Sequence, residues 1–123
     1  MAKMSEEVKA AIKEYRPGII ASANKAGKPN VSPAGSTHVI DDEHVAFANV
    51  ASPTTVANLK ENPQVAVICI NPTQRKGCRV WGRAEIVTSG ELFDKMTQQM
   101  AALKMKVINV VKITVEDSRT FAM

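Results

Sequence analysis

The spacing of apolar residues changes along the chain and predicts where helices and strands lie. Near the N-terminus apolar residues recur every three or four positions, the period of an amphipathic helix. These residues are Met4, Val8, Ala11, Ile12 and Tyr15. Ser5 is a suitable N-cap, and two acidic residues follow it in the first turn. Pro17-Gly18 then ends the predicted helix.

After this helix the period shortens and predicts strands. The candidate strands are 18–24, 29–40, 44–50, 64–70, 78–88 and 107–117. A Gly-containing turn at 25–28 separates the first two, and the acidic run 41–43 separates the next two. Because Pro33 and Gly35 interrupt 29–40, that segment is expected to be irregular, bulged or at a sheet edge.

Two further helices are predicted between the strands. Residues 52–63 form a short helix, in which Ser52 is the N-cap and Pro53 occupies the first position, where its missing N–H costs nothing. Residues 89–105 form a longer helix with one apolar stripe. That stripe contains Leu92, Phe93, Met96, Met100 and Leu103.

This order of elements predicts a mainly β fold. The connections between strands are mostly of hairpin length, which favours antiparallel pairing. There are too few long helices to cover both faces of an open sheet, so a small closed or partly closed barrel is the better solution. We therefore expect a six-stranded, mostly antiparallel β-barrel with peripheral helices, forming one domain over residues 1–123.

Composition supports a folded domain and limits its core. The chain has 123 residues, is 45% hydrophobic, and carries 16 basic against 12 acidic residues, a net charge of 16 − 12 = +4. These values do not fit a disordered chain, which has low hydrophobicity and high net charge. Aromatic residues make up only 4%, so aliphatic side chains must form the core. A short chain buries a limited core, which favours association with a second copy.

The sequence pattern shows neither a targeting signal nor the cluster of basic and aromatic residues that is typical of nucleic-acid-binding proteins. No apolar run approaches the ~20 residues of a membrane-spanning helix, and the N-terminal segment lacks the apolar region of a signal peptide. We therefore expect a cytoplasmic protein with reduced cysteines and no membrane partner. The densest basic stretch, 75–83, contains only one aromatic residue, Trp81, so a mildly basic surface is favoured over nucleic-acid binding.

Conventional catalytic and metal-binding signatures are also missing. The chain contains no P-loop, no G-x-G-x-x-G and no G-x-S-x-G nucleophile elbow. His38 and His44 are interpreted as polar residues flanking strands, because no Cys or carboxylate set around them has the spacing of a zinc site. Cys69 lies in an apolar run and is interpreted as an inert core thiol. We predict no catalytic side chain and no metal ligand.

One segment does point to ligand chemistry. In 47–58 a strand leads into the N-terminus of a helix, where unpaired N–H groups and the helix dipole favour an anion. Ser52, Thr54 and Thr55 add hydroxyl donors at the same point. An ordinary Ser/Thr-rich helix cap explains this spacing equally well, so the pattern alone leaves both interpretations open.

An ordered set of motifs resembles the pyridoxamine 5′-phosphate oxidase-like family of FMN-binding split barrels. The turn 25–28 is followed by a P-x-V-S-P return at 29–33. A Ser/Thr-rich turn then leads into N-L-K-E-N-P-Q-V-A-V at 58–67, and V-W-G-R-A follows at 80–84. The resemblance covers about residues 17–88, and the final helix and strand fit the same layout.

The resemblance implies a six-stranded split barrel that forms a homodimer and binds FMN non-covalently at the subunit interface. It further implies an FMN-dependent oxidoreductase in which the flavin performs the redox chemistry. The residues implied to bind the cofactor are Ser32, Pro33, Ala34, Phe47, Ala48, Asn49, Val50, Ser52, Thr54, Thr55, Asn58, Arg79 and Trp81. Of these, residues 32–34 and 47–50 would meet the ring and ribityl chain, 47–50 through main-chain groups. The Ser/Thr residues of 52–55 and Asn58 would meet the phosphate.

Some features depart from the family pattern and leave alternatives open. Many members carry Lys or Arg where this chain has Pro53-Thr54-Thr55, so the phosphate charge must come from elsewhere, with Arg79, Arg83 or Lys60 as candidates. The C-terminal Arg/His segment that grips pyridoxal phosphate is missing, so oxidation of vitamin B6 is not expected.

F420 is an alternative cofactor. A flavin-binding electron carrier and a basic nucleic-acid-binding module are alternative functions. The electron donor, a nicotinamide or a protein, is left open.

Overall fold

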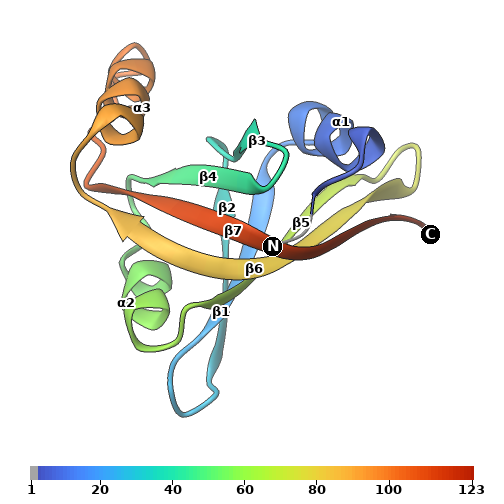
Figure 1. Cartoon of the computed structure of the whole chain (residues 1–123), viewed down its shortest axis with the longest axis horizontal. Helices are drawn as coiled ribbons and strands as arrows, with labels where there is room; N and C mark the ends of the chain where they lie inside the picture. The colour runs from blue at the N-terminus through green and yellow to red at the C-terminus, as the bar shows by residue number, and fades with distance from the viewer. Residues whose placement is uncertain (1–2) are drawn as a thin grey trace.

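The computed structural model describes residues 3–123 as a sheet with peripheral helices (Figure 1). The elements are α1 (Glu6–Glu14), β1 (Gly18–Ala23), β2 (Pro29–Ala34), β3 (His38–Asp41), β4 (His44–Asn49), α2 (Pro53–Glu61), β5 (Gln64–Asn71), β6 (Lys76–Val87), α3 (Glu91–Ala101) and β7 (Asn109–Ala122). The predicted cap of α1 is confirmed, because Ser5 Oγ accepts a hydrogen bond from the Val8 N–H at 3.1 Å. Within residues 3–123, no helix has the length and apolar character required to cross a bilayer.

The seven strands form one antiparallel sheet in the order β2-β1-β5-β6-β7-β4-β3. β2 and β3 lie at opposite edges, yet only residues 35–37 connect them. Four Cα–Cα steps span at most ~14 Å, so the two edges must approach each other and the sheet must curl. The result is a barrel that is open between β2 and the β3–β4 hairpin. The predicted mainly β, antiparallel split barrel is therefore confirmed.

The predicted number of six strands is wrong by one. Residues 29–40 form two strands on opposite edges, because the chain turns sharply between them. Thr37 is fully buried in this turn, and both its N–H and its Oγ1 donate to the carbonyl of Ala34, at 3.3 and 2.7 Å. The last strand also continues past its predicted end at residue 117 to Ala122, because the start of β6 pairs with it there.

The barrel interior is filled by aliphatic side chains from both halves of the sheet, and α1 covers one end of it (Figure 1). Val8 and Ile12 of α1 are buried against this core. Phe47 on β4 is the largest fully buried side chain. Because the chain has few aromatic residues, Val and Ile side chains on β5, β6 and β7 fill much of this core.

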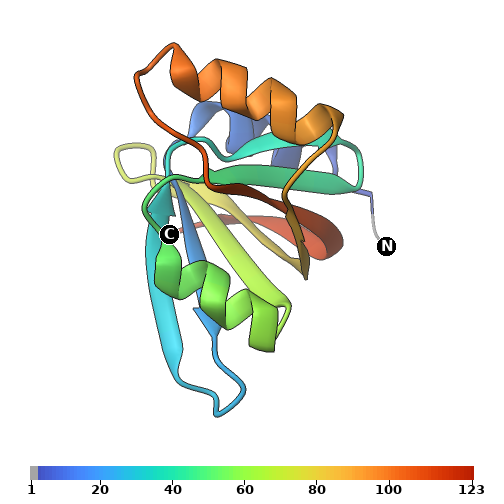
Figure 2. The ribbon, with the colours of Figure 1, turned by 90° about the vertical axis from the view of Figure 1, so that its left-hand side faces the viewer.

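A second, smaller core lies between α3 and the outer face of β4 and β7. Met96 of α3 is buried here against Ala46, Ala48 and Val110. Figure 2 shows α3 lying across the end of the molecule that carries β3 and β4. As a result β4 is buried on both faces, which explains why 44–50 reads as a nearly continuous apolar run.

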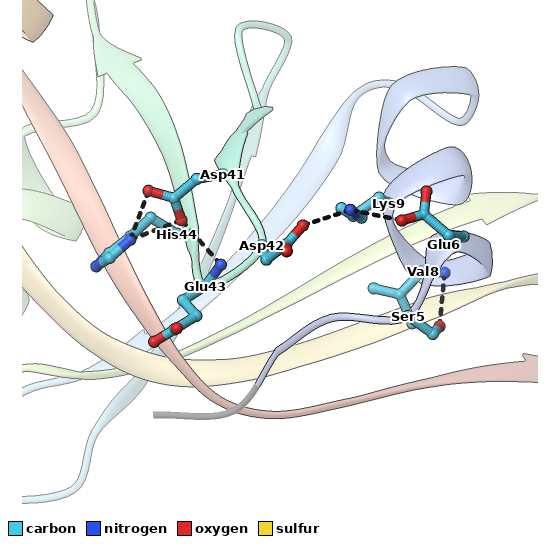
Figure 3. A network of polar contacts seen from close by, with 8 residues as sticks. All are labelled: Ser5, Glu6, Val8, Lys9, Asp41, Asp42, Glu43 and His44. Atoms are coloured by element: carbon cyan, nitrogen blue, oxygen red, sulfur yellow. Dashed lines mark hydrogen bonds and ion pairs between the residues drawn. The ribbon is translucent and has the colours of Figure 1, made fainter.

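A polar network ties α1 to the turn between β3 and β4 (Figure 3). Lys9 Nζ contacts the carboxylates of both Asp42 and Glu6. The Met4 N–H donates to the carbonyl of Asp42 at 2.8 Å. The hydrogen bond from Lys9 lowers the pKa of Asp42 below its ordinary value. Polar contacts at the exposed side therefore add to the apolar contacts that hold α1 on the barrel.

Candidate functional site

A pocket of about 830 Å³ opens at the split of the barrel, between β2, β4 and the C-terminal part of α3. Its wall consists of Arg16, residues 32–36, His38, Ala48, residues 50–52, Gln99, Met100, Leu103 and Met105. Figure 2 shows α3 above β4 and α2 below it. The volume lies in the upper part of the ~300–1,000 Å³ range of small-molecule sites. The split therefore provides room for a ligand.

Ser32 and Ser52 form one part of the wall, here called the serine end. Their hydroxyl oxygens are 3.3 Å apart, joining β2 to the start of α2. Ser52 is the N-cap residue of α2, but its side chain makes no cap hydrogen bond. The first turn of α2 contains Pro53 and no acidic residue. The positive end of the helix therefore remains available to an anion beside two hydroxyl groups.

The loop before α2 is held in place by a buried amide. Asn49 is 3% exposed, and its Oδ1 accepts a hydrogen bond from the Ser52 N–H at 2.8 Å. This bond fixes residues 50–52 against the end of β4. The middle of the pocket wall is then made by small side chains, including Ala34, Ala48 and Ala51. Such a wall leaves space for a flat ligand and exposes main-chain groups to its edge.

The pocket also has an Arg16 end, formed by Arg16, Ser36 and His38. Arg16 and His38 are the ionisable side chains among the wall residues, and no wall residue is acidic. Nδ1 of His38 lies 3.0 Å from the Ser36 carbonyl oxygen. Because a carbonyl oxygen only accepts, Nδ1 carries the proton. Within residues 3–123, no group of three or more metal-ligating side chains gathers here or elsewhere.

Comparison with known proteins identifies the family. The sequence profile of the pyridoxamine 5′-phosphate oxidase family matches residues 4–121, which is nearly the whole chain. The chain belongs to this family. The resemblance inferred from the motifs at 25–33, 58–67 and 80–84 is thereby confirmed. A search of curated proteins found no match.

Solved structures show that the fold is shared by several relatives. HupZ of Group A Streptococcus is 23% identical, with a TM-score of 0.86 over 98% of this chain and 94% of HupZ. An FMN-binding protein from Syntrophomonas wolfei subsp. wolfei is 16% identical, with a TM-score of 0.85 over 96% of this chain and 86% of that chain. An F420 reductase is 18% identical, with a TM-score of 0.70 over 94% of this chain and 98% of that chain. At these identities the likeness shows the fold alone.

The structure brings part of the predicted cofactor set of this pyridoxamine 5′-phosphate oxidase family member into the split pocket. The residues that line it are Ser32, Pro33, Ala34, Ala48, Val50 and Ser52. They come from two segments that are adjacent only because the sheet curls. Phe47 and Asn49 lie behind the wall, where Phe47 fills the barrel core and Asn49 supports the loop. Their main-chain role toward the flavin stays a prediction.

The remaining residues predicted around the phosphate on α2 have other neighbours within the chain. Thr55 is 1% exposed, and its Oγ1 accepts a hydrogen bond from Asn30 Nδ2 at 3.3 Å. Asn58 donates from Nδ2 to Ser22 Oγ at 3.2 Å. Both side chains therefore fasten α2 to β1 and β2. Thr54 is exposed and lies outside the pocket wall, although it belongs to the first turn of the same helix.

Arg79 and Trp81 do not face the split pocket of their own chain. The Arg79 guanidinium lies over the ring of Phe121, 4.7 Å from its centroid. Arg119 lies over the Trp81 ring at 5.3 Å. Trp81 lines a separate hollow of about 360 Å³ between β1, β5 and β6. A cofactor role for these two residues therefore requires the second subunit that the resemblance implies.

Sequence reasoning missed the wall residues contributed by α3, by Ser36 and by Arg16. The sequence predicts Met100 and Leu103 in the apolar stripe of a helix, and no local signal distinguishes a stripe that covers a core from one that covers a pocket. Leu103 is in fact 64% exposed. Arg16 precedes the Pro17-Gly18 stop and carries no motif. Its place near Ser36 follows from the pairing of β1 with β2, which ends at the pair Gly18–Ala34.

Cys69 is confirmed as a buried thiol, and the structure shows that Cys78, directly opposite it on the neighbouring strand β6, is buried as well. Both are 0% exposed. The hydrogen bond between them, together with burial, raises the pKa of the Cys69 thiol. We expect an aromatic disulfide reagent to react with both thiols of the native protein at least about 100-fold more slowly than in denaturant, because reaction requires opening of the core. Rapid titration of one thiol in the native protein would contradict this.

Proposed function

We propose that this chain is a flavoprotein of oxidoreductase type that binds FMN non-covalently at a homodimer interface. The observation that carries the proposal is the pocket at the barrel split, in which the serine end lies at the free N-terminus of α2. Family membership and a structural neighbour named as an FMN-binding protein support it. When bound, FMN supplies a ring that accepts and donates electrons or hydride.

The chemistry of the serine end fits a phosphate group. A phosphate requires several hydrogen-bond donors and positive potential. Ser32 and Ser52 supply hydroxyl donors, and the N–H groups of Thr54 and Thr55 lie in the first turn of α2, where no acceptor is available within the helix. The dipole of α2 adds positive potential at the same point. The cofactor phosphate would therefore be held mainly by neutral donors.

The middle of the pocket fits a flat aromatic ring system. Pro33, Ala34, Ala48 and Val50 leave a slot with small side chains on its walls. The chain's part in the reaction is to orient the ring, exclude water from one face and present main-chain groups to its edge. A deazaflavin such as F420 is the alternative cofactor, supported by the structural neighbour named as an F420 reductase.

Exposed apolar side chains support the proposed homodimer. Val31 on β2 is 69% exposed, and Leu103 and Ile108 beyond α3 are 64% and 60% exposed. Leu103 belongs to the pocket wall, so a second copy placed against it would also narrow the site. Arg79 and Trp81 would then reach the cofactor from the second subunit. The dimer would complete both the apolar core and the binding site.

Flavin titration tests this function and the position of the phosphate. The purified protein should bind FMN more tightly than riboflavin, which lacks the phosphate. Ser52→Ala should weaken FMN binding by about 10- to 150-fold and leave riboflavin binding almost unchanged, because a hydrogen bond to a charged group contributes ~1.5–3 kcal/mol. Quenching of flavin fluorescence gives both dissociation constants. Sedimentation of the flavin-loaded protein gives its oligomeric state.

Ser89→Ala is the matched control, because Ser89 is exposed and lies outside the pocket wall. It should bind FMN like the unmodified protein. Failure of the unmodified protein to bind FMN or F420 would exclude the proposed function. Equal loss of FMN and riboflavin binding in Ser52→Ala would show that the phosphate is held elsewhere.

A further inference from the structure

The Arg16 end of the split pocket is not used by the proposed contacts to FMN. Its Ser36 lies in the segment 35–37 that joins the two edge strands of the sheet. The serine end has its own donors for a phosphate. The pocket therefore contains a second polar region in addition to the serine end.

Two groups at the Arg16 end can donate hydrogen bonds to an anion. Within residues 3–123, no salt bridge engages the Arg16 guanidinium, and the pocket wall carries no carboxylate that would neutralise it. Ser36 Oγ accepts a hydrogen bond from the Ala48 N–H at 2.8 Å, so its own proton is free to point at a ligand. Arg16 and Ser36 both line the pocket, two residues beyond the strand pair Gly18–Ala34. A guanidinium and a hydroxyl group together suit a carboxylate, with which Arg forms two parallel hydrogen bonds.

The turn that carries Ser36 is held rigidly. Thr37 is 0% exposed and fastened to the Ala34 carbonyl, and His38 donates from Nδ1 to the Ser36 carbonyl at 3.0 Å. Gly18 lies against Thr37 so closely that an added Cβ would come 2.7 Å from Thr37 Oγ1. This contact also fixes the chain just after Arg16 beside the turn. The Ser36 hydroxyl is thus positioned before a ligand arrives, which reduces the entropic cost of binding.

Three side chains of the same pocket wall are apolar. Met100, Leu103 and Met105 come from the end of α3 and the segment after it. Leu103 and Met105 are 64% and 46% exposed, so they offer apolar surface that a ligand can cover. Methionine side chains adapt to ligands of different shape. The ligand that fits both features has one anionic group and an apolar body.

We propose that the Arg16 end binds the carboxylate of an apolar organic acid beside the flavin, with Arg16 and Ser36 as donors and Met100, Leu103 and Met105 against its body. This substrate class rests on the flavoprotein function proposed above. His38 is a positioning residue that holds Ser36. The other anion available to Arg16 is the phosphate of FMN itself, and the experiment separates the two.

The test compares 1-naphthoate with 1-naphthylmethanol, its uncharged analogue, on flavin-loaded and flavin-free protein. Calorimetric titration should show a preference for the naphthoate of about tenfold or more, which Arg16→Gln should abolish and Arg16→Lys should restore in part. Arg75→Gln is the matched control, because Arg75 is exposed in the β5–β6 turn and makes the same change in net charge. It should keep the preference. The ratio of FMN to riboflavin affinity should be unchanged in Arg16→Gln.

Three results would overturn the proposal. The naphthoate preference could persist in Arg16→Gln. The FMN-to-riboflavin ratio could fall in that variant, which would assign Arg16 to the cofactor phosphate. Naphthoate could bind only to flavin-free protein, which would place it in the flavin slot. If the unmodified protein binds no flavin, the proposed function fails, while the titration of flavin-free protein still decides whether Arg16 selects a carboxylate.

Discussion

Phe47→Ala is expected to lower the free energy of unfolding by about 3–5 kcal/mol, the usual cost of removing a buried phenylalanine side chain. Phe47 is 1% exposed and is the largest fully buried side chain of the barrel. Pairing of β4 with β7 fixes the backbone around it, with Phe47 opposite Val111. The barrel therefore cannot collapse to fill the cavity. Urea unfolding followed by circular dichroism, at one protein concentration, measures the loss.

Phe47→Leu separates the packing of this residue from its predicted role in cofactor binding. The leucine variant keeps the main chain and most of the apolar volume, so it should lose only about 1–2 kcal/mol of stability. Its affinity for FMN should stay within about threefold of the unmodified protein. Phe93→Ala, at a half-buried position on α3, should cost less than Phe47→Ala. A tenfold loss of FMN affinity in Phe47→Leu with unchanged stability would contradict a purely structural side chain.

Gly82→Ala should destabilise the barrel by about 3 kcal/mol, at the upper end of the cost of overpacking. Gly82 lies on β6 at an irregularity in its pairing with β7. A Cβ there would come 2.3 Å from the carbonyl oxygen of Thr114 and 2.8 Å from Ile113 Cγ2. Because the nearer atom belongs to the backbone, relief requires the two longest strands to separate. Thermal unfolding should show a melting temperature lower by about 10–15 °C.

Gly35→Ala provides the matched control for this substitution. No heavy atom lies within 4 Å of a Cβ built at Gly35, and its φ is outside the left-handed region. The alanine variant should therefore unfold within about 0.5 kcal/mol of the unmodified protein. Equal melting temperatures for the two variants would show that the close approach of β6 and β7 at Gly82 relaxes without cost.

Most elements of this fold could be predicted from local patterns, and the exceptions have tertiary causes. The residues that begin and end α1 are its neighbours in the sequence, so a local pattern could predict them, and the Ser5 cap is confirmed. Pro33 and Gly35 predicted that 29–40 would be irregular or at an edge, and β2 does lie at an edge. Its division into two strands could not be predicted locally, because it depends on Thr37 being buried against Gly18 on another strand. The extension of β7 to Ala122 likewise depends on the length of its partner β6. Strand ends are set by pairing, which a local pattern does not contain.

The candidate site likewise contains residues that could be predicted from local patterns and residues that could not. Ser32 and Ser52 were predicted from motifs, and the structure places their hydroxyl groups 3.3 Å apart. Thr55 and Asn58 have the residue types expected for a phosphate site, but their hydrogen bonds join α2 to the sheet. Arg16 and Ser36 could not be found from sequence, because neither belongs to a motif and the pairing of β1 with β2 brings them near each other, two residues beyond the pair Gly18–Ala34. The residue types indicated which side chains could donate hydrogen bonds to a ligand. The closure of the barrel determined which of these side chains face the pocket.

The open edge at β2 also bears on how the protein avoids aggregation. An exposed edge strand offers free N–H and C=O groups to which a strand from another molecule can add. Pro29 and Pro33 both lie in β2, and neither can donate a main-chain hydrogen bond. Pro29, Val31 and Pro33 are alternate residues of this short strand, so their main-chain nitrogens lie on the same side of it. Of these three residues only Val31 has an N–H group to donate. The proline residues of the P-x-V-S-P motif therefore make β2 a poor template for amyloid-like growth. The barrel can then remain open to ligands at this edge without recruiting strands from other molecules.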